Sequence, residues 1–145
     1  MREGIQTILA ELGEAACLAL CICELGKPGL TEGEALNLIL EGMRRGFIEY
    51  DEENRENPDN CYVADRDGLM KLVTGAPGWR SSREKADYRA KPGERVIEGW
   101  EWMERCKDRI IKHQHFRLVS WDPIKNSRTV KNGKIESLRV FWRAT

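Results

Sequence analysis

The sequence predicts an α+β fold in which N-terminal helices, one of them central and buried, pack on a C-terminal antiparallel sheet. Residues 14–26 are apolar almost all the way round a helical projection, and the apolar residues of 31–46 recur with helical spacing. The last third of the chain contains aromatic and β-branched segments and an Asn-Gly turn signal. Helices that precede the strands, rather than alternating with them, indicate segregated layers.

Two helices are predicted in the first part of the chain. The segment 14–26 begins a helix near Gly13 or Glu14, and Gly26 ends it because the following Lys-Pro-Gly cannot continue a helix. The second helix starts at Thr31, where Thr31 and Glu34 match a capping box, and ends at Gly46.

The middle of the chain is predicted to be mostly irregular. Residues 51–60 are polar and turn-rich, which predicts an exposed loop, and 61–64 are predicted to be extended. A short helix follows, capped by Asp65 and stopped by Gly75. Residues 76–94 are charged and show no apolar period, which predicts a long surface loop.

The sheet is predicted from three segments. Residues 95–103 and 110–121 have strand composition. Residues 127–144 are predicted to form a hairpin around Asn132-Gly133, the dipeptide that most strongly favours a two-residue hairpin turn. We expect one domain over 1–145, a length that buries a core without disulfides or a metal.

Composition limits the classes of partner. The chain has 24 basic and 24 acidic residues, so no net field attracts nucleic acid or an anionic membrane. The longest apolar run, 15–23, is too short to cross a bilayer, and the acidic N-terminal segment does not match a signal peptide. We therefore expect a cytoplasmic protein with neither a nucleic-acid nor a membrane partner; its oligomeric state stays open.

Cysteines are concentrated early in the chain, where Cys17, Cys21 and Cys23 lie within seven positions. Their spacing lacks the paired pattern of zinc sites, both histidines are almost a hundred residues away, and a cytoplasm keeps thiols reduced. We therefore expect neither metal nor another cofactor. Cys17 is nearest the helix start, where the macrodipole stabilises a thiolate. The alternative is that Cys17 is a small buried hydrophobe, as expected for the other cysteines.

A second candidate stretch lies in the segment His-Gln-His-Phe-Arg-Leu-Val-Ser-Trp-Asp-Pro. In a strand, His113 and His115 share one face and Phe116 points to the other. Asp122 follows near the strand end and would meet an imidazole if the chain folds back. The alternatives are a histidine bonded to backbone and an aspartate that serves its own turn. A thiol, an imidazole and an orienting carboxylate form a generalised catalytic triad.

A cysteine opening a central helix, followed by a late His-Phe-x-Leu-Val strand and Asp-Pro, resembles the papain-like cysteine peptidase superfamily, particularly small bacterial members such as the peptidases that cleave bacteriocin leaders. The segment 115–141 is also similar to a family of small proteins from bacterial plasmids and phages. The resemblance covers the chain in the order of its elements, and its motifs lie in about 13–24 and 113–142. It implies a papain-like fold.

The same resemblance implies roles for individual residues. Cys17 matches the nucleophile, His115 the general base and Asp122 the residue that orients the base, with His113 as a rival base. Members place a glutamine before the cysteine to help form the oxyanion hole, and Gln6 is the upstream candidate.

The implied function is hydrolysis of an amide bond in a peptide or protein substrate; peptidase, amidase, deamidase and acyltransferase reactions stay open. We expect the Cys17 sulfur to face the His115 imidazole across a cleft open to solvent. The alternative is a non-catalytic phage or plasmid module on the same scaffold that binds a protein through residues 76–94.

Overall fold

The computed structural model describes residues 14–50, 61–123 and 132–144. The described residues form an α+β fold with helices first and the main sheet last, as the sequence predicts. The helices and strands are α2 (Glu14–Gly26), α3 (Glu32–Arg44), β1 (Ile48–Tyr50), β2 (Cys61–Val63), α4 (Arg66–Thr74), β3 (Trp79–Lys85), β4 (Arg95–Cys106), β5 (Arg109–Arg117) and β6 (Lys134–Arg143).

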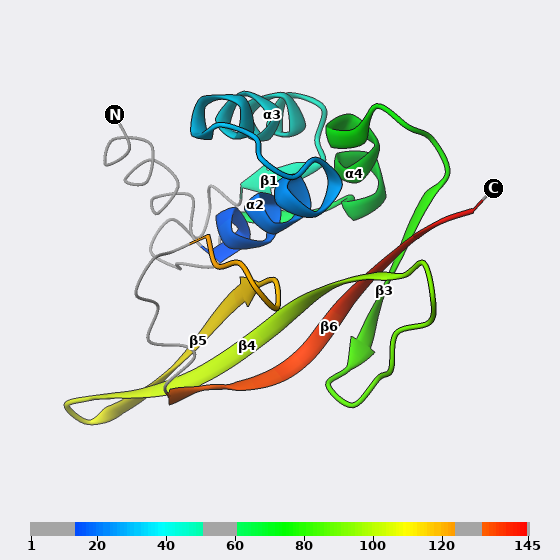
Figure 1. Ribbon diagram of the computed structural model, residues 1–145. Helices are drawn as coiled ribbons and strands as arrows, with labels where there is room; N and C mark the ends of the chain where they lie inside the picture. The colour runs from blue at the N-terminus through cyan, green and yellow to red at the C-terminus, as the bar shows by residue number, and fades with distance from the viewer. Residues whose placement is uncertain (1–13, 51–60, 124–131, 145) are drawn as a thin grey trace.

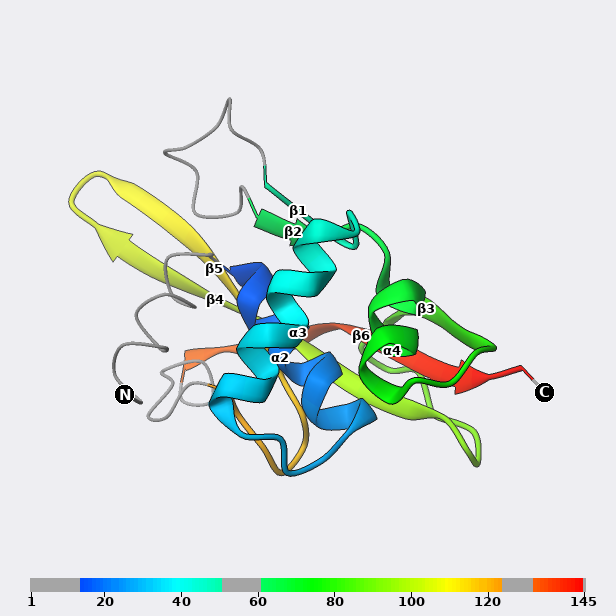
Figure 2. The same cartoon turned by 90° about the horizontal axis from the view of Figure 1, so that it is seen from above.

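The helices lie on one side of a four-stranded antiparallel sheet (Figure 1). The strand order is β3-β6-β4-β5, so β5 lies at one edge of the sheet, while β1 and β2 form a separate two-stranded ribbon beside the helices. Seen from above, the far end of the β4–β5 hairpin extends beyond the helices (Figure 2). Among the described helices, none combines the length and apolarity needed to cross a membrane.

The predicted helix ends are confirmed by their capping contacts. The Glu34 N–H donates to Thr31 Oγ1, and the Thr31 N–H donates to Glu34 Oε1, both at 3.1 Å. Asp65 Oδ1 accepts from the Gly68 N–H at 2.9 Å at the start of α4. Gly75 ends that helix with φ of 69°, a left-handed conformation that glycine adopts without a Cβ penalty.

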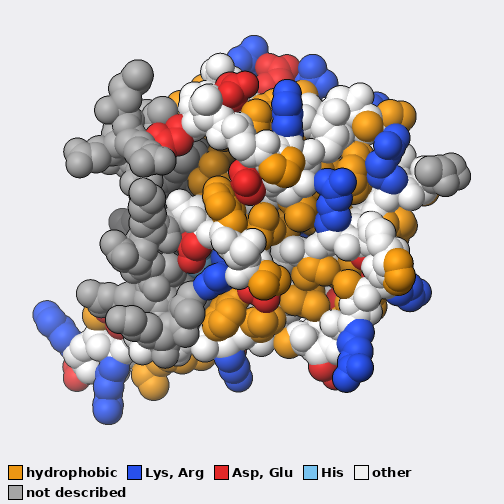
Figure 3. Space-filling view, in the orientation of Figure 1, with side chains coloured by type: hydrophobic (Ala, Val, Ile, Leu, Met, Phe, Trp, Pro, Cys, Tyr) orange, Lys and Arg blue, Asp and Glu red, His pale blue; other side chains and the backbone are white. Residues whose placement is uncertain are grey.

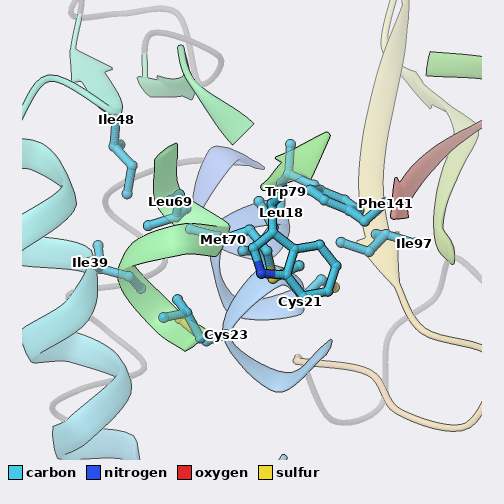
Figure 4. Close-up of a cluster of buried hydrophobic side chains, with 13 residues drawn as sticks. Leu18, Cys21, Cys23, Ile39, Ile48, Leu69, Met70, Trp79, Ile97 and Phe141 are labelled. Atoms are coloured by element: carbon cyan, nitrogen blue, oxygen red, sulfur yellow. The ribbon is translucent and has the colours of Figure 1, made fainter. Parts of the chain in front are cut away.

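The core gathers around α2, whose apolar residues contact elements on several sides (Figure 4). Ile22 and Cys21 of α2 are fully buried, together with Leu69 of α4 and Ile97 and Phe141 of the sheet. The prediction of a central buried helix is therefore confirmed. On the face shown in Figure 3, hydrophobic side chains also reach the surface between the helices and the sheet, and Lys and Arg lie mostly around them.

The prediction of one long loop over 76–94 is wrong. Trp79–Lys85 form β3, which pairs with β6 along its entire length. The polar sequence of β3 shows no strand pattern, because β3 lies at the edge of the sheet and takes its hydrogen-bond partners from β6. The ribbon strand β1 was also not predicted, because three residues carry too little periodicity.

The predicted strands 95–103 and 110–121 are present with shifted ends, as β4 and β5. β5 stops at Arg117, since the chain turns back immediately afterwards. The second half of the predicted hairpin 127–144 forms β6, which pairs with β3 and β4; the predicted loop 51–60 and the hairpin's first half lie outside the described residues.

Candidate functional site

The structure brings His115 and Asp122 together at the end of β5. A tight turn reverses the chain: the Leu118 N–H donates to the Trp121 carbonyl at 2.8 Å, and the Trp121 N–H donates to the Leu118 carbonyl at 3.4 Å. This turn returns Asp122 to the strand, where its Oδ1 lies 2.8 Å from His115 Nε2. The side chains are 6% and 18% exposed, so the contact is largely shielded from water.

The chemistry of this contact determines which imidazole nitrogen is basic. An ionised carboxylate only accepts hydrogen bonds, so His115 Nε2 carries the hydrogen that points at Asp122. In the neutral ring, Nδ1 then has the free lone pair. The contact with Asp122 thus fixes the orientation of the His115 ring.

The register of β5 sets the direction in which the imidazole leaves the strand. Phe116 pairs with Gly99 of β4 and packs on the main hydrophobic core, whereas His115 pairs with Trp100. Successive residues of a strand point to opposite faces, so the Cα–Cβ bond of His115 points away from the core face. Because β5 is an edge strand, the His115 ring meets Asp122 from the turn that follows the strand.

The three cysteines of α2 differ in burial. Cys17 is 6% exposed, Cys21 is 0% and Cys23 is 2%. Cys21 and Cys23 belong to the main hydrophobic core, whereas Cys17 is buried outside that cluster of side chains. Cys17 lies in the first described turn of the helix. Cys17 is therefore the α2 thiol nearest to solvent.

Electrostatics place the α2 thiols and the end of β5 in one neighbourhood. Burial raises the pKa of Cys21 well above its ordinary value, and negative charge on Cys17 and Asp122 raises it further. The nearby Arg117 guanidinium lowers the same pKa. Helix α2 also packs against β5 directly. Asp122 therefore contacts the imidazole and lies within electrostatic range of the Cys21 thiol.

The expectation of a solvent-open cleft between Cys17 and His115 is not met. Both side chains are buried, because α2 is packed into the core and the turn after β5 covers the imidazole. A surface cleft of about 740 Å³ lies elsewhere, where β3, the loop that follows it and β6 line it with residues that include Tyr88 and Trp142.

His113, the rival base, forms a second pair with a partner that the sequence reasoning missed. Its Nε2 lies 2.8 Å from Glu104 Oε2, and its ring stacks on Trp102 with centroids 4.2 Å apart. The two side chains of this pair are 33% and 39% exposed. The alternation of β4, which puts Trp102 and Glu104 on one face, was the available signal.

Arg117 is a further residue that the sequence reasoning did not assign to the site. Its Nε lies 3.9 Å from Glu98 Oε1, and its guanidinium lies 5.8 Å from the centroid of a Trp100 ring. Gln6, the predicted oxyanion residue, lies outside the described residues. Within the described part of the chain, no three His, Cys, Asp or Glu side chains are grouped as metal ligands.

No protein-family model, curated protein or solved structure matches this chain. Function is therefore inferred from the residues themselves. The features available for that inference are the buried His115–Asp122 pair and the neighbouring cysteines of α2.

Proposed function

We propose that the chain is a papain-like cysteine hydrolase that cleaves an amide bond in a peptide or protein, with Cys17 as nucleophile, His115 as base and Asp122 as the residue that orients the base. The observation that carries the proposal is the buried 2.8 Å contact between His115 and Asp122. An activated cysteine needs an imidazole that a carboxylate orients and a thiol within reach of that imidazole. His115 and Asp122 form the first of these contacts, and α2, which carries Cys17, packs against the strand of His115.

The proposed reaction proceeds through two acyl transfers. His115 Nδ1 takes the proton of Cys17, and the thiolate forms a bond to the substrate carbonyl carbon. The tetrahedral intermediate collapses, the C–N bond breaks, and the imidazolium returns the proton to the departing amine. Water then attacks the thioester with His115 as base, which releases the acid and restores the thiol. Asp122 stays ionised throughout and stabilises the imidazolium.

Burial and pKa select Cys17 as the nucleophile among the α2 cysteines. Cys21 is sealed in the core with a raised pKa, and burial raises the pKa of Cys23 to about 12. Both are therefore protonated at neutral pH, and a protonated thiol is a poor nucleophile. Cys17 is the most exposed of the three, at 6% against 0% for Cys21 and 2% for Cys23, and it lies outside the main core cluster.

The test is the rate of alkylation of each cysteine by iodoacetamide at pH 6, followed by mass spectrometry of the intact chain and its peptides. An activated Cys17 is expected to react at least tenfold faster than Cys106, an exposed thiol that serves as the internal control. Cys17→Ala should remove the fast phase, and Asp122→Asn should slow it. Slow labelling of Cys17, at or below the rate of Cys106, would reject the hydrolase.

A protein-binding module on the same scaffold is the second candidate. Exposed apolar side chains on the projecting β4–β5 hairpin favour it, since Met103 is 55% exposed and Ile110 is 71% exposed. This hairpin replaces residues 76–94 as the contact surface to test, because part of that segment is strand β3. Fast Cys17 labelling supports the hydrolase, whereas loss of partner capture in a Met103→Ser, Ile110→Ser variant supports the binding module.

A further inference from the structure

Three arginines converge on the helix-facing side of the sheet. Arg83 of β3 and Arg139 of β6 are directly opposed Cα partners in the antiparallel ladder. Arg66 reaches the same place from α4, since its Nε donates to Ser81 Oγ at 3.0 Å, and Ser81 is two residues before Arg83 on the same strand face. Like charges directly opposed across a ladder are destabilising unless anions compensate for them.

Two of the three arginines have acidic partners nearby. Arg83 Nη2 donates to Glu136 Oε1 at 2.9 Å. Arg66 is linked to Asp67 through Ser81, whose hydroxyl donates to Asp67 Oδ1 at 2.6 Å. Two carboxylates therefore face three guanidinium groups, which leaves an excess of one positive charge.

Arg139 forms no ion pair with a carboxylate among the described residues, and Glu136, whose charge acts on it, is already paired with Arg83. The Arg139 Nη1 donates to Ser137 Oγ at 2.8 Å, a neutral acceptor. The side chain is half-buried, and its guanidinium carbon lies 5.1 Å from the centroid of the Phe116 ring. Gly99 adjoins this place; a Cβ there would lie 2.9 Å from Ser137 Oγ and 3.2 Å from Phe116 Cε1, so only glycine leaves the packing undisturbed.

Burial and the neighbouring arginines also affect the ionisation of Arg139. Loss of water around the guanidinium, and then the charges of Arg83 and Arg66, lower its pKa to about 10. Arg139 nevertheless stays charged at neutral pH. An added anion stabilises a half-buried cation whose hydrogen-bond partner is neutral more than it stabilises a fully solvated cation.

We propose that Arg139, supported by Arg83 and Arg66, binds a carboxylate group of a peptide, either a chain terminus or an acidic side chain. A single carboxylate matches the excess of one charge, and its two oxygens can accept two parallel hydrogen bonds from a planar guanidinium. Arg83 is 54% exposed, so the cluster is open to solvent at that side chain. The cluster lies on the helix-facing side of the sheet, opposite to the direction of the His115 Cα–Cβ bond, and the proposal does not depend on the proposed hydrolase.

The test uses the full-length protein and follows the arginine Nε–H signals by NMR during titration with N-acetylglycine, which carries one carboxylate. N-acetylglycinamide is the matched neutral probe and inorganic phosphate the competing anion. We expect saturable shifts of the Arg139 signal with N-acetylglycine alone, at least tenfold weaker binding in Arg139→Gln, and a partial loss in Arg139→Lys. Arg80→Gln, an exposed position on the other face of β3, should bind as the parent chain does.

Three results would overturn the carboxylate site: equal affinity of the parent chain and Arg139→Gln, equal binding of the neutral amide, or tighter binding of phosphate than of N-acetylglycine. If Arg139→Gln does not fold, the more exposed Arg83→Gln replaces it, with at least a threefold loss expected and an unchanged affinity counting against the site.

Discussion

Removal of the Asp122 carboxylate should destabilise the fold because it leaves a buried donor without its acceptor. In Asp122→Ala, the His115 Nε2–H loses the partner at 2.8 Å while the ring stays enclosed, with 6% of the side chain exposed. Leaving such a group unsatisfied costs about 1–3 kcal/mol of the free energy of unfolding. Asp122→Asn retains an acceptor oxygen and should cost less than Asp122→Ala.

The neighbouring pair provides a matched control with the same bond length. His113 and Glu104 are also 2.8 Å apart, on the same hairpin, but their side chains are 33% and 39% exposed. Water can replace the lost acceptor there, so Glu104→Ala should cost about 0–1 kcal/mol. The two pairs share their bond length and differ strongly in burial, so comparison of the two variants tests the effect of burial.

Urea unfolding at pH 7, followed by tryptophan fluorescence, gives the free energy of unfolding of each variant. The double replacement His115→Leu, Asp122→Leu removes donor and acceptor together and should cost less than Asp122→Ala alone. Equal losses in Asp122→Ala and Glu104→Ala would refute the claim that burial sets the cost. A double variant less stable than Asp122→Ala would refute the unsatisfied-donor explanation.

Three further outcomes test the packing and the ionisation of other residues. Burial raises the pKa of Cys23 from 9.0 to about 12, so the thiol ionises at lower pH in the unfolded chain than in the folded one. The resulting stabilisation of the fold is complete below pH 9 and is lost as the pH rises towards 12, by up to about 1.4 kcal/mol per pH unit. In urea unfolding between pH 8 and 10, the free energy of unfolding should therefore fall less steeply with pH in Cys23→Val than in the parent chain. Gly99→Ala should cost about 1–3 kcal/mol through overpacking against Ser137, whereas Gly33→Ala in α3, where a Cβ meets nothing within 4 Å, should stabilise by about 0.5–1 kcal/mol; equal thermal shifts of the two variants would contradict this contrast. Thr31→Ala should cost about 1 kcal/mol by removing the capping box, measured by thermal unfolding, and an unchanged midpoint would show that the cap contributes little.

The features that the sequence predicted correctly are those determined by neighbours in the chain. The cap of α3 needs only Thr31 and Glu34, and the end of α4 needs only a glycine at a left-handed position. The apolar composition of α2 likewise implies burial wherever its neighbours come from. Strand β3 was missed because a polar edge strand is determined by β6, a segment about fifty residues away.

The candidate site depended on contacts that no local pattern encodes. Asp122 meets His115 because Leu118 and Trp121 close a turn between them, and the residue types around Asp122 allow that turn without requiring it. The burial of Cys17 and the pairing of Glu104 with His113 likewise depend on how α2 and β4 pack on β5. The sequence therefore identified candidate site residues, whereas their burial and several of their partners are set by the packing of the fold.

The two histidine pairs also differ in what their presence implies. A solvent-exposed pair such as His113–Glu104 changes the free energy of unfolding little, whether it is present or absent. Its presence therefore gives no evidence for a function. A buried pair requires removal of both polar groups from water, and apolar side chains of similar size often stabilise a fold as well or better. His115 and Asp122 therefore add little to stability that leucine could not supply. An arrangement that stability alone does not favour is consistent with the proposed hydrolase, in which the His115 ring takes up and releases a proton.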